Sequence, residues 1–304
     1  MQNLQFTTTK PKVDFYLGSD FHIEAFICKK FFDPSSVIPK IGKDPTHFNI
    51  CLLAGDICVL KRMYRNKQFM AEFCKHFDLV FYIEGNHENY NGNLNHGFKK
   101  FREYCSDIDN LVFLQQETVI FKVNNQQFKI IGATLWGDLR NADQTMLFHA
   151  TRTQKTAVSS NYYMTDFSKI RTEQSRYAYP MLSLHTYMLA NKKDREFIIG
   201  ELQSLSSDTI NILMTHHSPI YAAIDKEDSY NAFEHSDLTD EIKSSRLNFS
   251  VFGHIHRGFG NVLDIGTNKF KTGECTCFSN PAGYYELSKE DSRYALETIF
   301  SCDI

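Results

Sequence analysis

Short apolar runs recur along the chain, and each of them ends abruptly in small or polar residues. Five runs have the length of a strand, and they cover residues 13–17, 48–54, 79–83, 210–214 and 249–252. Continuous apolar runs of this length are typical of strands that are buried on both faces. The pattern therefore predicts five core strands.

Apolar residues also recur at helical spacing between these strands, over residues 63–77, 98–108 and 197–205. The segments 111–114, 118–123, 128–131 and 295–300 are typical of further strands, and Asn124-Asn125 predicts a hairpin turn between the second and third of them. Strands that alternate with helices, with hairpin strands added, indicate a layered α/β sandwich.

One stretch, at about 138–191, fits this alternation poorly because it is rich in Thr, Ser, Tyr and Met with basic residues interspersed. We predict a single domain over residues 1–304, with a partly helical, cap-like insertion at about 138–191 that lies over the functional site. A solvated peripheral excursion is the alternative interpretation of the same stretch.

Composition narrows the class of protein only modestly. The chain has 304 residues, 42% hydrophobic and 23% charged, which is typical of a globular protein, and its formal net charge of −3 gives no global basic field for nucleic acid. It shows no secretory signal and no apolar run near the roughly 18 residues that a membrane span needs. The eight cysteines form no obvious disulfide framework, so we expect free thiols and a cytoplasmic protein.

The chemistry lies where the five core strands end. Each run is followed by residue types that bind metals, and the candidates are Asp20, His22, Asp56, Asn86, His216, His254 and His256. Because ligands of open α/β sheets bind beyond the carboxyl ends of the strands, we expect these side chains to converge. In 20–22 and 254–256, alternate spacing directs two side chains the same way from an extended segment. His217 is adjacent to this pattern and is not included in it.

The donor set indicates the kind of ion. Two carboxylates, one carboxamide and four imidazoles suit Mn²⁺, Fe²⁺ or Zn²⁺ better than Mg²⁺ or Ca²⁺. Seven donors exceed the needs of one ion but fit two ions that share a carboxylate. We predict two divalent ions, with Mn²⁺ favoured. Such a centre keeps a net positive charge, so a phosphate ester is the substrate that it suits best.

In combination, these residues resemble the motifs of the calcineurin-like metallophosphoesterases. The matching segments are Asp20-Phe21-His22, Gly55-Asp56, Gly85-Asn86-His87-Glu88, Thr215-His216 and Gly253-His254-Ile255-His256. The resemblance spans residues 20–256. It implies a four-layer αββα sandwich, in which helices flank two mixed β-sheets and a di-metal site lies at the edge.

The resemblance also implies a role for each matching residue. It assigns Asp20, His22 and His256 to the first ion, Asn86, His216 and His254 to the second, and Asp56 to both. The nucleophile would be a metal-bound hydroxide that attacks in line. His87 would contact the phosphate and protonate or stabilise the leaving oxygen.

Departures from the family pattern exclude two of its branches. After Gly55-Asp56 the chain continues as Ile57-Cys58-Val59-Leu60, without the Asp-Arg-Gly segment of phosphoprotein phosphatases. Val59 stands where purple acid phosphatases have a tyrosine ligand. Because the Asp of the Asp-Arg-Gly segment is absent, the carboxylate that supports the catalytic histidine is missing from its usual place. Glu88 is a candidate for that role.

Two further segments, 132–136 and 279–284, resemble an uncharacterised bacterial and phage subgroup of the family. Trp136 in the first is compatible with stacking on a nucleobase or with packing. Asn280, Pro281 and Gly283 in the second favour a structural turn near the ligands.

Three functional classes are compatible with these patterns. The leading hypothesis is a phosphodiesterase or phosphomonoesterase that acts on a small molecule, with nucleotides among the candidates. A nuclease of the same superfamily is the second, although the acidic total and the lack of an evident basic groove disfavour it. A non-catalytic metal-binding scaffold is the third, and the complete ligand set disfavours it. No membrane partner is indicated, and the oligomeric state is left open.

Overall fold

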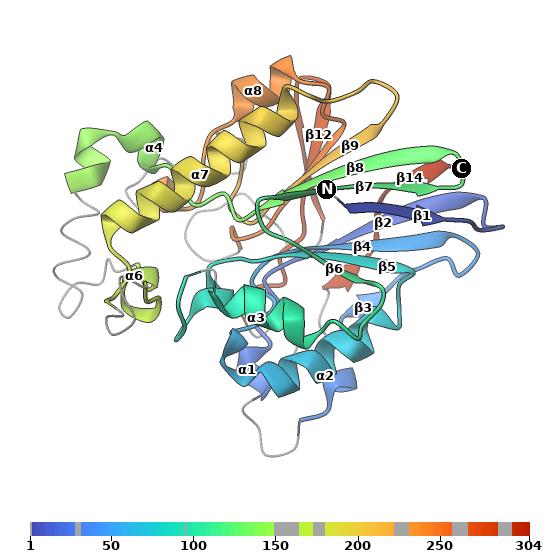
Figure 1. Ribbon diagram of the computed structural model, residues 1–304, viewed down its shortest axis with the longest axis horizontal. Helices are drawn as coiled ribbons and strands as arrows, with labels where there is room; N and C mark the ends of the chain where they lie inside the picture. Colours follow the sequence, from blue (N-terminus) through green and yellow to red (C-terminus); the bar gives the residue numbers. More distant parts are fainter. Residues whose placement is uncertain are drawn as a thin grey trace.

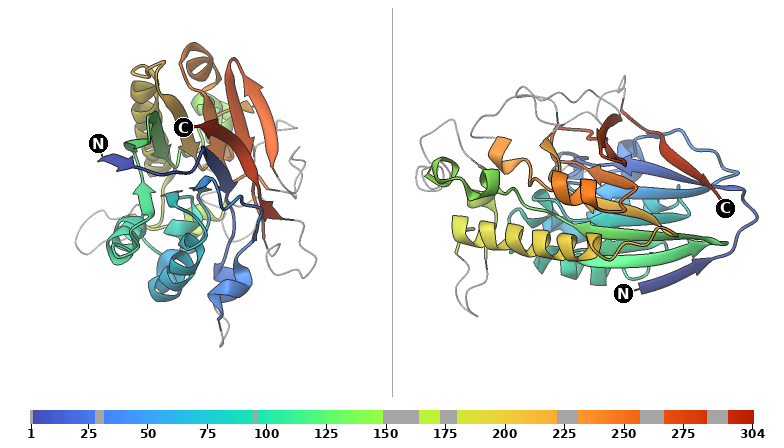
Figure 2. Two further views of the ribbon diagram at one scale, coloured as in Figure 1. Left: turned by 90° about the vertical axis from the view of Figure 1, so that its right-hand side faces the viewer. Right: turned by 90° about the horizontal axis from the view of Figure 1, so that it is seen from above.

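The computed structural model describes residues 2–27, 32–94, 96–148, 164–172, 180–221, 231–256, 267–284 and 294–304. Its strands form a seven-stranded sheet, a five-stranded sheet and a small two-stranded sheet. The two large sheets stack face to face, and helices cover the outer face of each (Figure 1). Figure 2 shows the same layers from two other directions, with the long helix α7 (Leu184–Leu202) running along one outer face.

The five-stranded sheet holds the first three predicted core strands. Its order is β14 (Thr298–Asp303), β2 (Lys12–Gly18), β4 (Phe48–Ala54), β5 (Leu79–Ile83) and β6 (Leu111–Leu114). Strands β2, β4, β5 and β6 are mutually parallel, and β14 pairs antiparallel with β2. The carboxyl ends of β2, β4 and β5 therefore meet at one edge.

The seven-stranded sheet holds the other two. Its order is β1 (Gln2–Phe6), β7 (Glu117–Val123), β8 (Gln126–Ala133), β9 (Ile210–Thr215), β10 (Phe249–Phe252), β12 (Cys275–Ser279) and β11 (Asn268–Thr272). Strands β8, β9, β10 and β12 are parallel. The predicted hairpin joins β7 to β8 at Asn124-Asn125, whose first residue has φ 52°. Strand β1 was not expected from the sequence.

Seven helices and four short 3₁₀ helices lie wholly within the described ranges. The helices besides α7 are α1 (Glu24–Ile27), α2 (Met63–Cys74), α3 (His96–Tyr104), α4 (Leu139–Ala142), α6 (Asp166–Lys169) and α8 (Thr239–Ser244). The 3₁₀ helices are η1 (Pro34–Val37), η2 (Leu60–Arg62), η3 (His87–Asn89) and η5 (Asn231–Phe233). The predicted strand at 295–300 is two elements, because β13 (Ala295–Leu296) pairs with β3 (Lys40–Ile41) before β14 begins.

Three apolar clusters explain the layers. Phe15 and Ile50 of one sheet pack with Phe121, Ile130 and Met214 of the other, and all five side chains are buried. A second cluster joins the five-stranded sheet to α1 and α2, and a third joins the seven-stranded sheet to α7 and α8. Because the core strands are covered on both faces, their sequences are continuously apolar. The four-layer αββα sandwich of two mixed sheets flanked by helices is therefore confirmed.

Other expectations can be compared directly. Six of the cysteines are buried free thiols and Cys302 is a half-buried one, whereas Cys28 lies outside the described residues. Trp136 is 1% exposed and contacts Tyr187 edge to face at 5.4 Å, which supports packing over stacking on a nucleobase. No described helix is both long and apolar enough to cross a membrane.

Candidate metal centre

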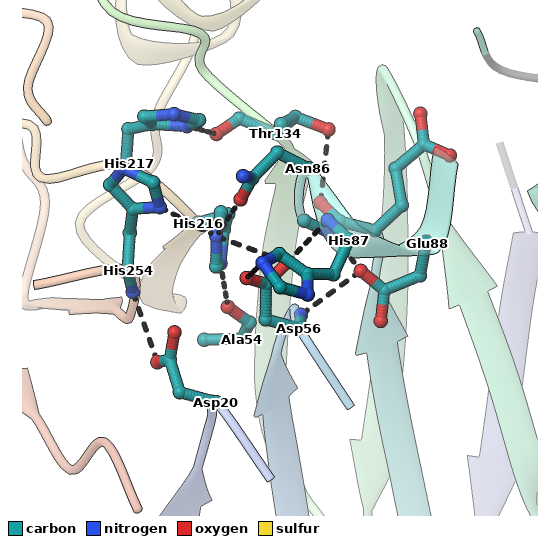
Figure 3. A network of polar contacts seen from close by, with 12 residues as sticks. Asp20, Ala54, Asp56, Asn86, His87, Glu88, Thr134, His216, His217 and His254 are labelled. Carbon is teal, nitrogen blue, oxygen red and sulfur yellow. Dashed lines mark hydrogen bonds and ion pairs between the residues drawn. The ribbon is translucent and has the colours of Figure 1, made fainter. Parts of the chain in front are cut away.

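The loops that follow the core strands bring all seven candidate ligands together at one edge of the sandwich. Asp20 and His22 follow β2, Asp56 follows β4, and Asn86 follows β5. From the other sheet, His216 follows β9, and His254 and His256 follow β10. Figure 3 shows five of them around one point, with His87 beside them. The site is thus shared between the two sheets.

The first group of donors is Asp20, His22 and His256, whose ligand atoms all lie within 4.8 Å of one another. Asp20 Oδ1 and His22 Nε2 are 4.0 Å apart. Both atoms are buried, and neither has a hydrogen-bond partner among the described residues. Buried polar atoms normally have hydrogen-bond partners. Two unpartnered atoms that can both ligate a metal, and that face each other, therefore fit a bound cation.

The second group is Asp56, His216 and His254, again with ligand atoms within 4.8 Å. His216 Nε2 lies 3.4 Å from Asp56 Oδ1, 3.1 Å from His254 Nδ1 and 3.0 Å from Asn86 Oδ1. His216 Nδ1 donates to the carbonyl of Ala54 at 2.8 Å, which leaves Nε2 for an ion. The two groups are linked by the His254 N–H, which donates to Asp20 Oδ2 at 3.0 Å.

Sharp backbone turns place these side chains. Asp20, His22, Asp56 and His254 have φ values of 56°, 46°, 54° and 65°, in the left-handed region that L-residues seldom occupy. The prediction that 20–22 and 254–256 are extended segments is therefore wrong. The backbone turns immediately after each of these strands. This turn directs the ligands into the centre, and the alternation of side chains along an extended strand does not. Such strain costs about 1–3 kcal/mol per residue and concentrates at functional sites.

Gly85 allows the loops after β4 and β5 to touch. A Cβ on Gly85 would lie 2.2 Å from Asp56 Oδ1 and 2.7 Å from the Asp56 nitrogen. Gly55 has φ 84°, and a Cβ there would lie 2.6 Å from His216 Nδ1. These glycines are required because the backbone passes so close to the ligands.

Glu88 fastens the same two loops together. Its carboxylate accepts the backbone N–H groups of Asp56 at 3.0 Å, Ile57 at 2.8 Å and Gly85 at 2.8 Å, together with the hydroxyl of Tyr82 at 2.6 Å. The side chain is buried. Glu88 is therefore committed to the loop backbone, and the suggestion that it supports the catalytic histidine is wrong.

Glu24, at the start of α1, faces His87 instead. Glu24 Oε1 lies 2.9 Å from His87 Nδ1 and 3.3 Å from His22 Nδ1. Burial opposes the charge of this carboxylate, but hydrogen bonds from the two imidazoles lower the pKa of Glu24 to about 2. On its other side, His87 Nε2 lies 3.2 Å from the hydroxyl of Tyr284 and 3.9 Å from Asp56 Oδ2. Glu24 was not among the residues predicted from the sequence.

Opposite charges in the centre stabilise one another. Burial works against ionisation of Asp56, yet the positive charges of His216 and His87 hold the pKa of this carboxyl well below its usual range. Burial likewise disfavours the charged imidazoles, yet Asp56 is the main cause that raises the pKa of His216 to about 10 and that of His87 to about 9. A divalent cation would take the place of the proton on His216, since ligands bind metals in their deprotonated form.

His217 is buried beside the second group, although the sequence pattern left it out. Its ring centroid lies 4.1 Å from that of His254, and its Nε2 has no described hydrogen-bond partner. Burial, together with the neighbouring His216, holds the pKa of His217 well below its usual range. His217 therefore lies against the metal ligands as an uncharged ring.

Comparison with known proteins agrees with this geometry. The model of the calcineurin-like phosphoesterase family matches residues 15–258, which include all seven candidate ligands and His87. The chain belongs to this family. Family members are phosphoesterases that typically bind divalent metals, and the described residues contain candidate metal-binding groups of His and Asp.

Individual relatives of this phosphoesterase are distant. Uncharacterized protein L509 of Acanthamoeba polyphaga mimivirus is 22% identical over 291 residues, which cover 89% of this chain and 95% of the viral protein. Among solved structures, the phosphopantetheinyl hydrolase PptH of Mycobacterium tuberculosis is similar with a TM-score of 0.68 and 14% identity, over 96% of this chain and 97% of that one. A likeness at this identity shows the shared fold.

Proposed function

We propose that this protein hydrolyses a phosphate ester at a centre for two divalent metal ions. The observation that carries the proposal is the pair of adjacent donor groups, Asp20–His22–His256 and Asp56–His216–His254, at the edge shared by both sheets. The unpartnered, buried Asp20 Oδ1 and His22 Nε2 support it, because neither atom has a described partner that would compensate for its burial.

The donor set divides between two positions. Asp20, His22 and His256 would hold the first ion, Asn86, His216 and His254 the second, and Asp56 would contact both. Mn²⁺ suits this mixture of nitrogen and oxygen donors best, with Fe²⁺ or Zn²⁺ as alternatives. When bound, the ions would lower the pKa of a water nucleophile and neutralise charge on the phosphate.

His87 is the proposed general acid. Glu24 accepts the Nδ1–H of His87, so the second ring nitrogen, Nε2, points away from the carboxylate and toward Asp56 Oδ2 and the Tyr284 hydroxyl. A proton held at Nε2 is therefore directed at the position where a leaving oxygen would lie. Glu24 takes the part that Glu88 was expected to play.

We infer a small-molecule phosphoester as the substrate class, with the choice between diester and monoester left to experiment. The structural likeness to PptH makes a phosphopantetheinyl ester one compound worth including, beside nucleotides. The substrate panel should therefore contain both diesters and monoesters.

The first test is turnover by metal-stripped protein reloaded with Mn²⁺, assayed on bis-p-nitrophenyl phosphate and p-nitrophenyl phosphate. Asp56→Asn should lose activity on both esters, whereas His185→Ala, which removes an exposed histidine from α7, should retain it. Strong diester turnover would direct the search to diester substrates, and monoester preference to phosphorylated metabolites. Two bound metals without hydrolysis of any panel compound would contradict the proposal and favour the scaffold hypothesis.

A further inference from the structure

The segment that carries α6 is bonded directly to the loop beyond His87. The Asn91 N–H donates to the carbonyl of Lys169 at 2.7 Å, and Leu94 and Gly92 exchange backbone hydrogen bonds with Arg171 at 2.8 and 2.9 Å. Figure 1 shows α6 at the same end of the sandwich as α4, below the start of α7. This part of the predicted insertion therefore reaches the candidate metal centre.

Asp166 is the residue of α6 that touches the centre. It is 1% exposed, and its Oδ1 accepts hydrogen bonds from Asn86 Nδ2 at 2.9 Å and from the Tyr90 hydroxyl at 2.8 Å. Its Oδ2 is buried without a hydrogen-bond partner among the described residues. The next residue, Phe167, is buried against Tyr187 of α7, which holds the start of α6 in place.

The contact fixes which end of the Asn86 amide faces the metal position. An asparagine side chain has a donor end and an acceptor end, whereas an ionised carboxylate can only accept. With Nδ2 held by Asp166, Asn86 Oδ1 must point the opposite way, and there it lies 3.0 Å from His216 Nε2. A flipped amide would place its oxygen against the carboxylate and its NH₂ group against the ion.

A second contact runs from the same carboxylate to His87. The Tyr90 ring stacks on the His87 ring with a centroid distance of 4.0 Å, and its hydroxyl is bonded to Asp166. The Tyr90 hydroxyl also lies 3.3 Å from Asn86 Nδ2, so the three side chains form a closed set. One carboxylate therefore contacts both the side chain proposed as a ligand and the ring beneath the proposed acid.

We propose that Asp166 is a positioning residue for the second metal ion, supplied by the predicted insertion, and that it acts by orienting the amide of Asn86. The inference rests on the proposed function, because it takes Asn86 as a ligand. It assigns to the 138–191 segment a structural part in metal binding beyond that of a cover.

The experiment is a Mn²⁺ titration of metal-stripped protein by calorimetry, which requires no substrate. Asp166→Leu removes both acceptors at similar size, and Asp166→Asn keeps one oxygen while removing the charge. We expect two binding events in the parent protein. In the Leu variant, the Mn²⁺ affinity of the second binding event should fall by about 10- to 100-fold, the range found when partners of metal ligands are removed. The affinity of the first binding event should stay unchanged.

The Asn variant separates orientation from charge. If Asp166 acts by orienting the Asn86 amide, Asp166→Asn should restore the Mn²⁺ affinity of the second binding event to within about threefold of the parent value. The Oδ1 of the new side chain can still accept from Asn86. Tyr90→Phe is the matched control. It removes the hydroxyl that bonds to Asp166 and lies 3.3 Å from Asn86 Nδ2, but it leaves the 2.9 Å bond from Asn86 to Asp166, so this variant should still bind two ions. Melting curves establish that each variant is folded, and Asp166→Ala replaces the Leu variant if that protein does not fold.

The outcomes distinguish this inference from the proposed function. Parent-like binding of two ions by the folded Leu or Ala variant would overturn the inference and leave the phosphoesterase proposal intact. Equal loss in the Asn and Leu variants would show that charge matters and orientation does not, which also overturns it. A parent protein that binds no metal would remove the basis of both.

Discussion

Replacing Glu24 by Gln provides a direct test of the proposed acid. The substitution keeps an oxygen that can accept from His87 Nδ1, now 2.9 Å from Glu24 Oε1, but removes the negative charge. The imidazole should therefore stay in place while its protonated form loses stabilisation. Glu24 Oε1 also lies 3.3 Å from Nδ1 of His22, a candidate metal ligand. The metal content of the variant must therefore be measured as a control.

The magnitude follows from the type of hydrogen bond. A bond to a charged group contributes about 1.5–3 kcal/mol, roughly twice a neutral one. Losing the charge should therefore destabilise protonated His87 by about 1–2 kcal/mol and lower its pKa. At a pH above that pKa, the protonated fraction, and with it kcat, should fall by about five- to thirtyfold. The loss should appear where the leaving group needs a proton. It should be small where the leaving group departs as a stable anion.

The assay compares kcat for diphenyl phosphate and bis-p-nitrophenyl phosphate, or for the matching monoesters, in four proteins: parent, Glu24→Gln, His87→Ala and the double variant. The Glu24 effect should be confined to the phenyl ester and should vanish when His87 is absent. Equal losses on both esters at full metal content would refute the reasoning. So would an undiminished Glu24 effect in the His87→Ala background.

Other substitutions test the centre and the fold. Asp56→Asn should abolish turnover and reduce metal content, and a variant with parental rate and metal content would contradict this. Gly85→Ala should lower the free energy of unfolding by about 1–3 kcal/mol because its Cβ would overlap Asp56. Gly200→Ala, at an exposed helical position with nothing within 4 Å of the added Cβ, should raise it by about 0.5–1 kcal/mol; chemical denaturation measures both, and equal shifts would argue against the steric account. Burial raises the pKa of Asp194 to about 6, above the usual value of about 4, so its contribution to stability is complete below pH about 4 and is lost as the pH rises through 6, by roughly 2–3 kcal/mol. Unfolding free energies of the parent protein should therefore fall relative to Asp194→Asn over that range, and parallel pH curves would contradict the assignment.

The core strands and the convergence of the candidate ligands could be predicted because both leave a local pattern. Apolar runs buried on two faces are continuous, and each is followed directly by residues such as Asp56 or His216. Parallel pairing then brings distant strand ends to one edge, whatever the connecting loops contain. The expectation for the layers depended on few loop details, and it was correct.

The supporting residues could not be predicted in the same way. Glu24 lies two positions from His22, but the left-handed turn at His22 and the start of α1 decide where its carboxylate points. Glu88 is adjacent to His87 in sequence and bonds elsewhere, because backbone N–H groups of the neighbouring loop are closer. Asp166 is 80 residues from Asn86, and no periodicity indicates that contact. Contacts of this kind depend on loop geometry, which a residue pattern does not specify.

Each of the two donor groups draws on both sheets, and this has a consequence for biosynthesis. Asp20 and His22 leave the ribosome more than two hundred residues before His256, and Asp56 precedes His254 by a similar interval. Neither group can be complete while the chain is still short. If the centre binds metal as proposed, loading would therefore follow synthesis of the second sheet and its docking on the first. Once loaded, each ion would join the early and late portions of the chain, and chelation would loosen the connection between them.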